Sequence, residues 1–200
     1  MDFSVRLMQP SDVSAVAGLQ RLCFPEPFPA ELLWKPEHLL KHLELFPSGQ
    51  FVVTCGGRIV ASASNTRVSE ERFQAHESWD ATVGGPLLET FDPAGSTLYG
   101  LDISVHPDCR HKGIGRALYQ ARFDLATRDQ IRYATACRIP SFGPYEGSLE
   151  AFIAEVASES STDPTLTPLL KLGMTAIKGL HDYMEDEESR NCAVLLEWKP

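Results

Sequence analysis

The first third of the chain alternates between strand-like and helix-like spacing of its hydrophobic positions. Phe3 to Leu7 alternate hydrophobic and polar residues as a short strand does, and Pro10-Ser11-Asp12 then supplies start and cap signals for a helix. Residues 50–54 and 59–64 are two strand-like runs joined by a Gly56-Gly57 turn, which predicts an antiparallel hairpin. This part of the chain therefore predicts a strand, a helix and a hairpin in that order.

The rest of the chain continues in the same mixed way. We expect further helices over residues 32–45, with an interruption or a new start at Pro36, and over 115–126, 149–156 and 163–172, and further strands over 98–105, 131–139, 174–179 and 192–198. Two segments lie between these elements, at about residues 70–95 and 140–163, and the first is typical of a long irregular connection. The order predicts one α/β (α+β) domain over residues 1–200, enlarged by these two insertions.

The composition and net charge of the chain exclude several classes of protein. Hydrophobic residues make up 43 % and charged residues 22 % of the chain, which is the profile of a globular protein. With 27 acidic against 18 basic residues the net charge is −9, so nucleic acid is not the expected partner. We find neither an apolar run of about 18 residues nor a signal-peptide pattern, and expect a cytoplasmic protein without a membrane span. Five scattered cysteines without a C-x-x-C predict reduced thiols and no structural zinc.

The most informative stretch is the turn between the strand at residues 98–105 and the helix after it. Gly113 and Gly115 remove side chains where the helix begins, so several backbone N–H groups can converge on an anion with the helix dipole behind them. Basic residues gather in the same stretch of an otherwise acidic chain: Arg110, Lys112, Arg116 and Arg122. We therefore expect an anionic ligand at this turn.

The turn matches neither of two common nucleotide-binding loops. The chain has no G-x-x-x-x-G-K-[ST] sequence, and a dinucleotide fingerprint would need a third glycine where Leu118 stands and a place at the first strand. A Gly-x-Gly pair at a tight turn is also common without any ligand. The two glycines alone therefore leave a purely structural turn as an alternative.

The spacing Arg-x-x-Gly-x-Gly from Arg110 to Gly115 follows a Val-x-Pro and precedes a leucine. This stretch resembles the acyl-CoA-binding motif of the GCN5-related N-acetyltransferases (GNATs). The opening strand and helix, the hairpin and Lys171-Leu172-Gly173-Met174 are also similar to parts of that family. Arg138-Ile139-Pro140 and Glu197-Trp198 look like the acetyltransferase domain that some bacteria place before a nitrilase-like hydrolase. The chain ends at Pro200, so we expect no hydrolase within it.

The resemblance implies a mixed, mostly antiparallel sheet of about seven strands flanked by helices, in which the central fourth and fifth strands splay apart. It also implies acetyl-coenzyme A (acetyl-CoA) as co-substrate, with the pantetheine arm between these strands and the diphosphate on the amides of the turn. The implied cofactor-binding residues are Ser104, Val105, Arg110, His111, Lys112, Gly113, Ile114, Gly115 and Arg116. No metal ion is implied.

Members of this family transfer the acetyl group directly to an amine, which must first lose a proton. Asp102 is our first choice for the base because it lies in the fourth strand near the expected thioester; its alternative role is a structural bond to a neighbouring element. His106 is the second candidate base. Many relatives protonate the leaving thiolate with a tyrosine where this chain has Leu169. Tyr145 and Tyr183 are the substitutes, and each also fits an ordinary packing aromatic.

Two other patterns have weaker support. Cys109 beside Arg110 would gain thiolate character, but no histidine and aspartate accompany it at a suitable spacing. His38 and His42 are spaced i, i+4 as a zinc pair would be, yet the stretch lacks the glutamate and the third ligand of a zinc site. We expect an ordinary thiol and an ordinary helix face.

The sequence therefore predicts an acetyl-CoA-dependent N-acetyltransferase that modifies a primary amine on a small molecule or a peptide. The alternative is an acyl-CoA-binding module with little or no turnover, acting as a sensor or as the partner of another enzyme, and the leucine at position 169 favours it. Acidic residues at 70–71 and 182–188 would attract a cationic acceptor, although a solvated surface explains them equally well. The acceptor and the oligomeric state, a homodimer included, stay open.

Overall fold

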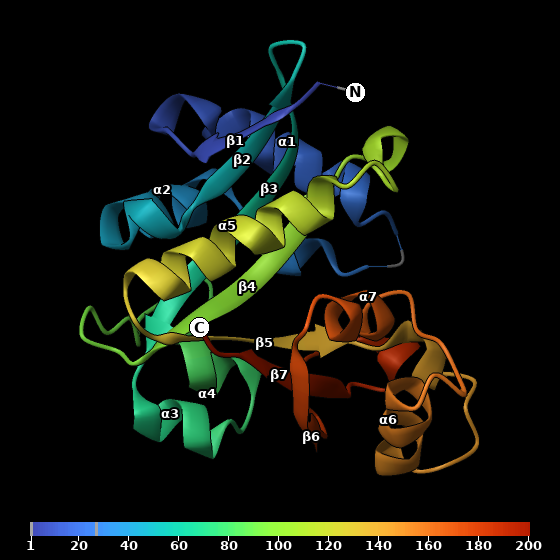
Figure 1. Cartoon of the computed structure of the whole chain (residues 1–200). Coiled ribbons are helices and arrows are strands. Elements are labelled where there is room, and N and C mark those ends of the chain that lie inside the picture. Colours follow the sequence, from blue (N-terminus) through green and yellow to red (C-terminus); the bar gives the residue numbers. More distant parts are fainter. Residues whose placement is uncertain (1, 27) are drawn as a thin grey trace.

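A seven-stranded mixed sheet runs through the molecule (Figure 1). The computed structural model describes residues 2–26 and 28–200. In chain order the strands are β1 (Ser4–Leu7), β2 (Phe51–Cys55), β3 (Arg58–Val68), β4 (Thr97–Val105), β5 (Arg132–Arg138), β6 (Thr175–Leu180) and β7 (Ala193–Trp198). Their order in the sheet is β1-β2-β3-β4-β5-β7-β6. Among the described residues, β4 and β5 form the one parallel pair, so the expected mixed, mostly antiparallel sheet is confirmed.

Helices cover both faces of this sheet. One face carries α1 (Val13–Cys23), α2 (Pro36–Leu45), α3 (Glu70–Ala75) and α4 (Trp79–Val83), and the other carries α5 (Ile114–Arg128), α6 (Leu149–Ala157) and α7 (Leu166–Lys171). Neighbouring strand residues divide between the faces: Leu98 and Tyr133 pack with α5, whereas Tyr99 and Ala134 pack with α3 and α4. This two-residue alternation is typical of a sheet that is buried on both sides.

The central strands β4 and β5 pair over only part of their length. Thr97–Gly100 pair with Arg132–Thr135, and beyond these residues β4 pairs with β3 alone and β5 with β7 alone. At the same place the β3–β4 register shifts, because Ser64 pairs with Asp102 while Asn65 pairs with Gly100. This shift leaves one extra residue in β4, and such a bulge bends a strand away from its neighbour. The expected splay between the fourth and fifth strands is therefore present.

The segment at residues 70–95 differs from the expected irregular connection, because it contains α3 and α4. Each helix starts at a serine cap: the hydroxyl oxygens of Ser69 and Ser78 accept hydrogen bonds from backbone amides three residues later, at 3.3 and 3.2 Å. His76 and Gly84 end the helices in the left-handed conformation. Serine caps with acidic residues in the first turn are helix-start signals, which the many polar residues of the segment obscured.

Other element boundaries lie within a few residues of the expected ones. Helix α2 begins at Pro36, and Ala30–Leu32 form a separate 3-10 turn before it. Helix α7 begins at Leu166, because the carboxylate of Asp163 accepts hydrogen bonds from the amides of Thr165 and Leu166, both at 2.8 Å. All five cysteines are free thiols. No helix in the described part of the chain is long and apolar enough to cross a membrane.

Candidate active site

The turn before α5 presents backbone groups rather than side chains. Gly113 is the N-cap residue of α5 and has a φ of 81°, a left-handed conformation that glycine adopts without strain. Apart from its chain neighbours and the backbone of its own helix, a Cβ atom added at Gly113 or at Gly115 would have no heavy atom within 4 Å among residues 2–26 and 28–200. Both glycines therefore border open space at the start of α5, a helix of 15 residues.

Six consecutive backbone amides at this turn, from His111 to Arg116, have no hydrogen-bond acceptor within residues 2–26 and 28–200. The ladder of α5 begins with the amide of Ala117, which donates to the carbonyl of Gly113 at 3.0 Å. Free N–H groups at the positive end of a helix dipole favour binding of a phosphate group. The turn has the donors and the space that an anion requires.

Two basic side chains of the turn are tied to its own framework. The guanidinium of Arg110 donates to the carbonyl of Val105 at 3.2 Å and to that of Cys23 at 3.3 Å, so it joins the end of β4 to the end of α1. Lys112 donates to the carbonyl of Asp108. Both side chains add positive charge beside the free amides while they fix the path of the loop.

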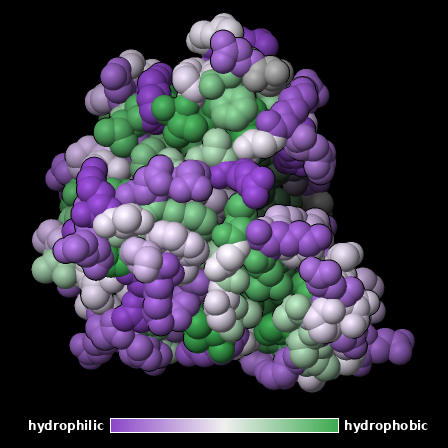
Figure 2. Space-filling model, viewed as in Figure 1, coloured by the Kyte–Doolittle hydropathy of each residue, from purple (hydrophilic) through white to green (hydrophobic). Residues whose placement is uncertain are grey.

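The remaining two basic residues of the stretch lie in different environments. Arg116 is exposed in the first turn of α5, on the outward side of the helix, where Figure 2 shows mainly hydrophilic side chains. Arg122 is only 1 % exposed and lies between α5 and the sheet. Of the four basic residues that gather in this stretch of the sequence, Arg122 therefore lies apart from the turn, because two helical turns carry it away from the helix start and onto the buried side.

Asp102 lies in β4 beside the bulge, with its side chain toward α1. Its Oδ2 accepts hydrogen bonds from the Gln20 amide at 2.7 Å and from the Ser104 hydroxyl at 3.3 Å. Its Oδ1 is buried and has no hydrogen-bond partner among the described residues. Burial raises the pKa of Asp102 above its ordinary value, and the neighbouring Trp34 and Arg122 oppose that rise. The carboxylate thus has one fixed oxygen and one free oxygen.

The backbone amide of Trp34 fixes the side chain of Gln20. The Trp34 amide donates to Gln20 Oε1 at 3.2 Å, and the Trp34 ring packs edge-on against the ring of His42, with 4.9 Å between centroids. His42 is fully buried, and its Nε2 lies 2.9 Å from the carbonyl oxygen of Pro86. Burial lowers the pKa of His42 to about 4, so the ring is neutral at pH 7. That nitrogen is engaged with the backbone.

Sequence reasoning missed the roles of Gln20 and Trp34. Gln20 continues the buried stripe that Val13, Val16 and Ala17 form on α1. A polar side chain in such a stripe is rarely buried without a specific partner, and this signal could have identified Gln20. Trp34 lies in the connection between α1 and α2, where no periodic pattern points to a partner.

His106 and Cys109 both serve the turn that follows β4. His106 Nδ1 accepts a hydrogen bond from the Asp108 amide at 3.3 Å, and the His106 carbonyl accepts one from the Cys109 amide at 2.8 Å. The side chain of Cys109 is buried in the apolar core beneath α5. The structure therefore gives these two residues local structural partners.

The two tyrosines considered as proton donors have partners of their own. The hydroxyl of Tyr145 donates to Glu155 at 2.6 Å, and that of Tyr183 lies 2.6 Å from the hydroxyl of Tyr99. Leu169 is 2 % exposed and packs in the core under α7. In the described structure, both tyrosine hydroxyls are therefore engaged with other side chains, and position 169 has no hydroxyl.

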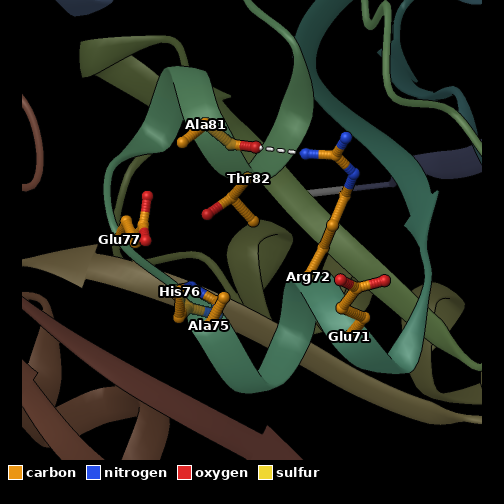
Figure 3. A pocket seen from close by; sticks show the side chains of 7 residues that line it. All are labelled: Glu71, Arg72, Ala75, His76, Glu77, Ala81 and Thr82. Atoms are coloured by element: carbon orange, nitrogen blue, oxygen red, sulfur yellow. Dashed lines mark hydrogen bonds between the residues drawn. The ribbon is translucent and has the colours of Figure 1, made fainter.

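A cavity of about 220 Å³ lies between α3 and α4 (Figure 3). Figure 3 shows Arg72 reaching across it to the carbonyl of Ala81, a hydrogen bond of 2.7 Å. His76 lines the cavity and its Nε2 lies 2.9 Å from the Tyr99 hydroxyl. The lining includes neither Asp102 nor any residue of the turn before α5, so we assign the cavity no part in the reaction.

Comparison with known proteins identifies related chains in Bacillus subtilis (strain 168). One, an uncharacterized N-acetyltransferase YkwB, is 34 % identical over 199 residues, which cover 98 % of this chain and 88 % of the relative. A second, the probable hydrolase YhcX, is 32 % identical over 198 residues, which cover 97 % of this chain and 38 % of the relative. The chain therefore spans well under half of that second protein, in agreement with the expected likeness to a domain joined to a hydrolase.

Solved structures with the same fold include the GphF GNAT-like decarboxylase in complex with isobutyryl-CoA. The two chains superpose with a TM-score of 0.80 at 21 % identity, over 98 % of each. The family model for the acetyltransferase (GNAT) family matches residues 13–141, which hold the free amides of the turn, the splay and Asp102. The chain is therefore a member of the acetyltransferase (GNAT) family.

Proposed function

We propose that the protein transfers the acetyl group of acetyl-CoA to a primary amine. The observation that carries this proposal is the row of six free amides from His111 to Arg116, which follow the part of β4 that is not paired with β5. These amides, with Arg110, Lys112 and Arg116 beside them, would hold the diphosphate of the donor. The acyl donor supplies an activated thioester, and the chain supplies binding, orientation and proton transfer.

The splay offers the pantetheine arm a strand edge. Beyond Gly100 the β5 side of β4 lacks a ladder partner in the described structure, so backbone groups near Ser104 and Val105 are available to an extended amide chain. The bound donor would then lie between the free amides and Asp102. This placement brings the thioester to the level of the free carboxylate oxygen.

Asp102 would accept the proton that the amine releases, directly or through one water. Its Oδ1 has no protein partner, whereas Gln20 and Ser104 hold Oδ2. Because burial raises the pKa of Asp102, the carboxylate is a stronger base than an exposed aspartate. The rate should fall as the pH drops through that raised pKa, since protonation removes the base.

The second candidate function is an acyl-CoA-binding module with little turnover. Leu169 stands where many relatives carry a proton-donating tyrosine, and the hydroxyls of Tyr145 and Tyr183 are engaged elsewhere. A site that binds the donor without protonating its leaving group would hold acyl-CoA and release thiol slowly.

Calorimetry with acetyl-CoA, followed by thiol release in a panel of polyamines, amino acids, aminoglycosides and peptides, tests the proposal. We expect micromolar binding and stimulation of thiol release by at least one class of primary amine. Binding without stimulation by any amine would favour the module. The absence of acetyl-CoA binding would contradict both functions.

A further inference from the structure

Arg122 places a buried guanidinium directly beneath the bulge of β4. It projects from α5, is 1 % exposed, and has no carboxylate within 4.0 Å in the part of the chain that the structure describes. One terminal nitrogen donates to the carbonyl of Ser64 at 3.2 Å and to the carbonyl of Asp102. The Nε atom is buried without a partner. A buried cation without an anionic partner is costly, so its retention calls for a role.

The two carbonyls that Arg122 binds belong to the pair at which the register shifts. Ser64 and Asp102 are the last β3–β4 partners before the extra residue of β4. A bulge disrupts the local ladder, and a donor from a packed helix can satisfy the backbone oxygens at that place. The rings of Tyr119 and Tyr133 lie 5.0 and 5.6 Å from the guanidinium carbon, so two aromatic faces stabilise the cation where it binds.

We propose that Arg122 is a positioning residue, which holds the Asp102 backbone at the bulge so that the Asp102 carboxylate stays directed at the opposite face of the sheet. This inference rests on the proposed function for its kinetic consequences. Its structural content, a link from α5 through the strand to the carboxylate, is independent of the acceptor.

The charge of Arg122 also acts on the carboxylate across the strand. The groups that face Asp102 are Gln20 and Cys23 from α1, Trp34 from the α1–α2 connection, Ser64 from β3 and Ser104 from β4. Of these, Cys23 alone is titratable, and burial raises the pKa of its thiol, so it is neutral at pH 7. Arg122 is therefore the cation that favours the ionised form of Asp102.

Substitution of Arg122 by methionine and by lysine separates the contribution of its charge from that of its guanidinium shape. Met removes the charge and both hydrogen bonds, whereas Lys keeps the charge but lacks the planar guanidinium that lies over the rings of Tyr119 and Tyr133. We expect kcat to fall about 100-fold in Arg122→Met and about 10-fold in Arg122→Lys, as loss of active-site orientation does. The Kd for acetyl-CoA should change by less than about threefold, because the free amides lie two helical turns away. Arg128→Met, on the exposed end of the same helix, is the matched control and should leave both kcat and the Kd unchanged.

The pH dependence distinguishes positioning from a purely structural role. In Arg122→Met the acidic limb of the rate profile should move to higher pH, and in Arg122→Lys it should stay in place. Carbon NMR of the Asp102 carboxyl group reports the same titration without turnover, so the inference is tested even if no amine is acetylated. A titration of Asp102 that is the same in all three proteins would overturn it. If Arg122→Met does not fold, an Arg122→Lys protein with wild-type kcat would overturn it as well.

Discussion

The turn before α5 and the surroundings of Asp102 are built from opposite kinds of groups. The turn uses consecutive backbone amides, open to solvent, and its two glycines have no neighbouring atoms where a side chain would lie. Asp102 is held by side chains from α1 and β4, and its partner Gln20 is 82 residues away in the chain. One region is local and exposed, and the other is assembled by the tertiary fold and buried.

Because of this difference, substitutions should disrupt the two regions in different ways. Only a proline substitution removes a backbone N–H, so other substitutions disrupt the turn by filling or reshaping the space in front of it. A side-chain network loses function when any one member is replaced, because each buried polar group depends on its partner. We expect substitutions at the turn to affect donor binding and substitutions around Asp102 to affect turnover.

The largest effect should come from Gly113→Glu. The new carboxylate would enter the space in front of the free amides and repel the diphosphate, and a loss of several kcal/mol corresponds to about 1000-fold weaker acetyl-CoA binding in calorimetry. Gly57→Glu is the matched control, since Gly57 at the tip of the β2–β3 hairpin has a similar φ of 77° and equally open surroundings. Equal losses in both variants would mean that strain, and not the anion site, is responsible.

Asp102→Asn tests the other region. We expect kcat to fall about 100-fold, as removal of a general base does, with the Kd for acetyl-CoA changed by less than about threefold. Steady-state thiol release and calorimetry measure the two quantities. Asp124→Asn, on the exposed side of α5, makes the same chemical change outside the site and should be neutral. A wild-type rate and pH profile in Asp102→Asn would show that Asp102 is not the base.

Acid should weaken the buried region through His42. Its pKa is about 4 in the folded protein, below the ordinary value, so the unfolded chain takes up a proton first and stability is lost as the pH falls from about 6.5 toward 4. Between pH 7.5 and 5, the free energy of unfolding should fall by about 2 kcal/mol more in the wild type than in His42→Phe. Urea denaturation at the two pH values measures this.

The exposed His181 supplies the control for that measurement. His181→Phe should retain the pH dependence of the wild type, because the exposed His181 side chain is replaced while the buried His42 stays in place. If His42→Phe and His181→Phe respond alike to acid, His42 does not carry the effect.

The smallest effect should come from Gln20→Leu. Loss of the 2.7 Å hydrogen bond leaves Oδ2 of Asp102 with the longer bond from Ser104 alone. Because the carboxylate can then rotate, kcat should fall by about 10-fold. Gln120→Leu is the control, because Gln120 also donates to an aspartate, at 2.8 Å, but on the exposed side of α5. A Gln20→Leu protein as active as the control would limit Gln20 to packing.

The local half of the site was predictable from the sequence and the assembled half was not. Gly113 and Gly115 follow a strand and open a helix, and that short stretch is enough to predict the turn; its anionic ligand stays a prediction. Gln20 and Trp34 meet Asp102 only because α1 packs across β4. No spacing in the sequence encodes that contact, and the same applies to the burial of Arg122.

The fold shows the same division. Strands and long helices with clear periodicity lie within a few residues of the predicted positions, as for α5 and the β2–β3 hairpin. The two helices at residues 70–95 were missed because helices of five and six residues are defined by their caps and not by a periodic stripe.

The short contact between β4 and β5 also divides the sheet mechanically. Strands β1 to β4 form one antiparallel unit and β5, β7 and β6 form another, and four residue pairs join them edge to edge. A donor lying in the splay would supply a ladder where the protein has none, and would bridge the two units along the rest of the seam. In that arrangement the bound donor also joins the two halves of the sheet. Donor binding would therefore make the two halves unfold more cooperatively.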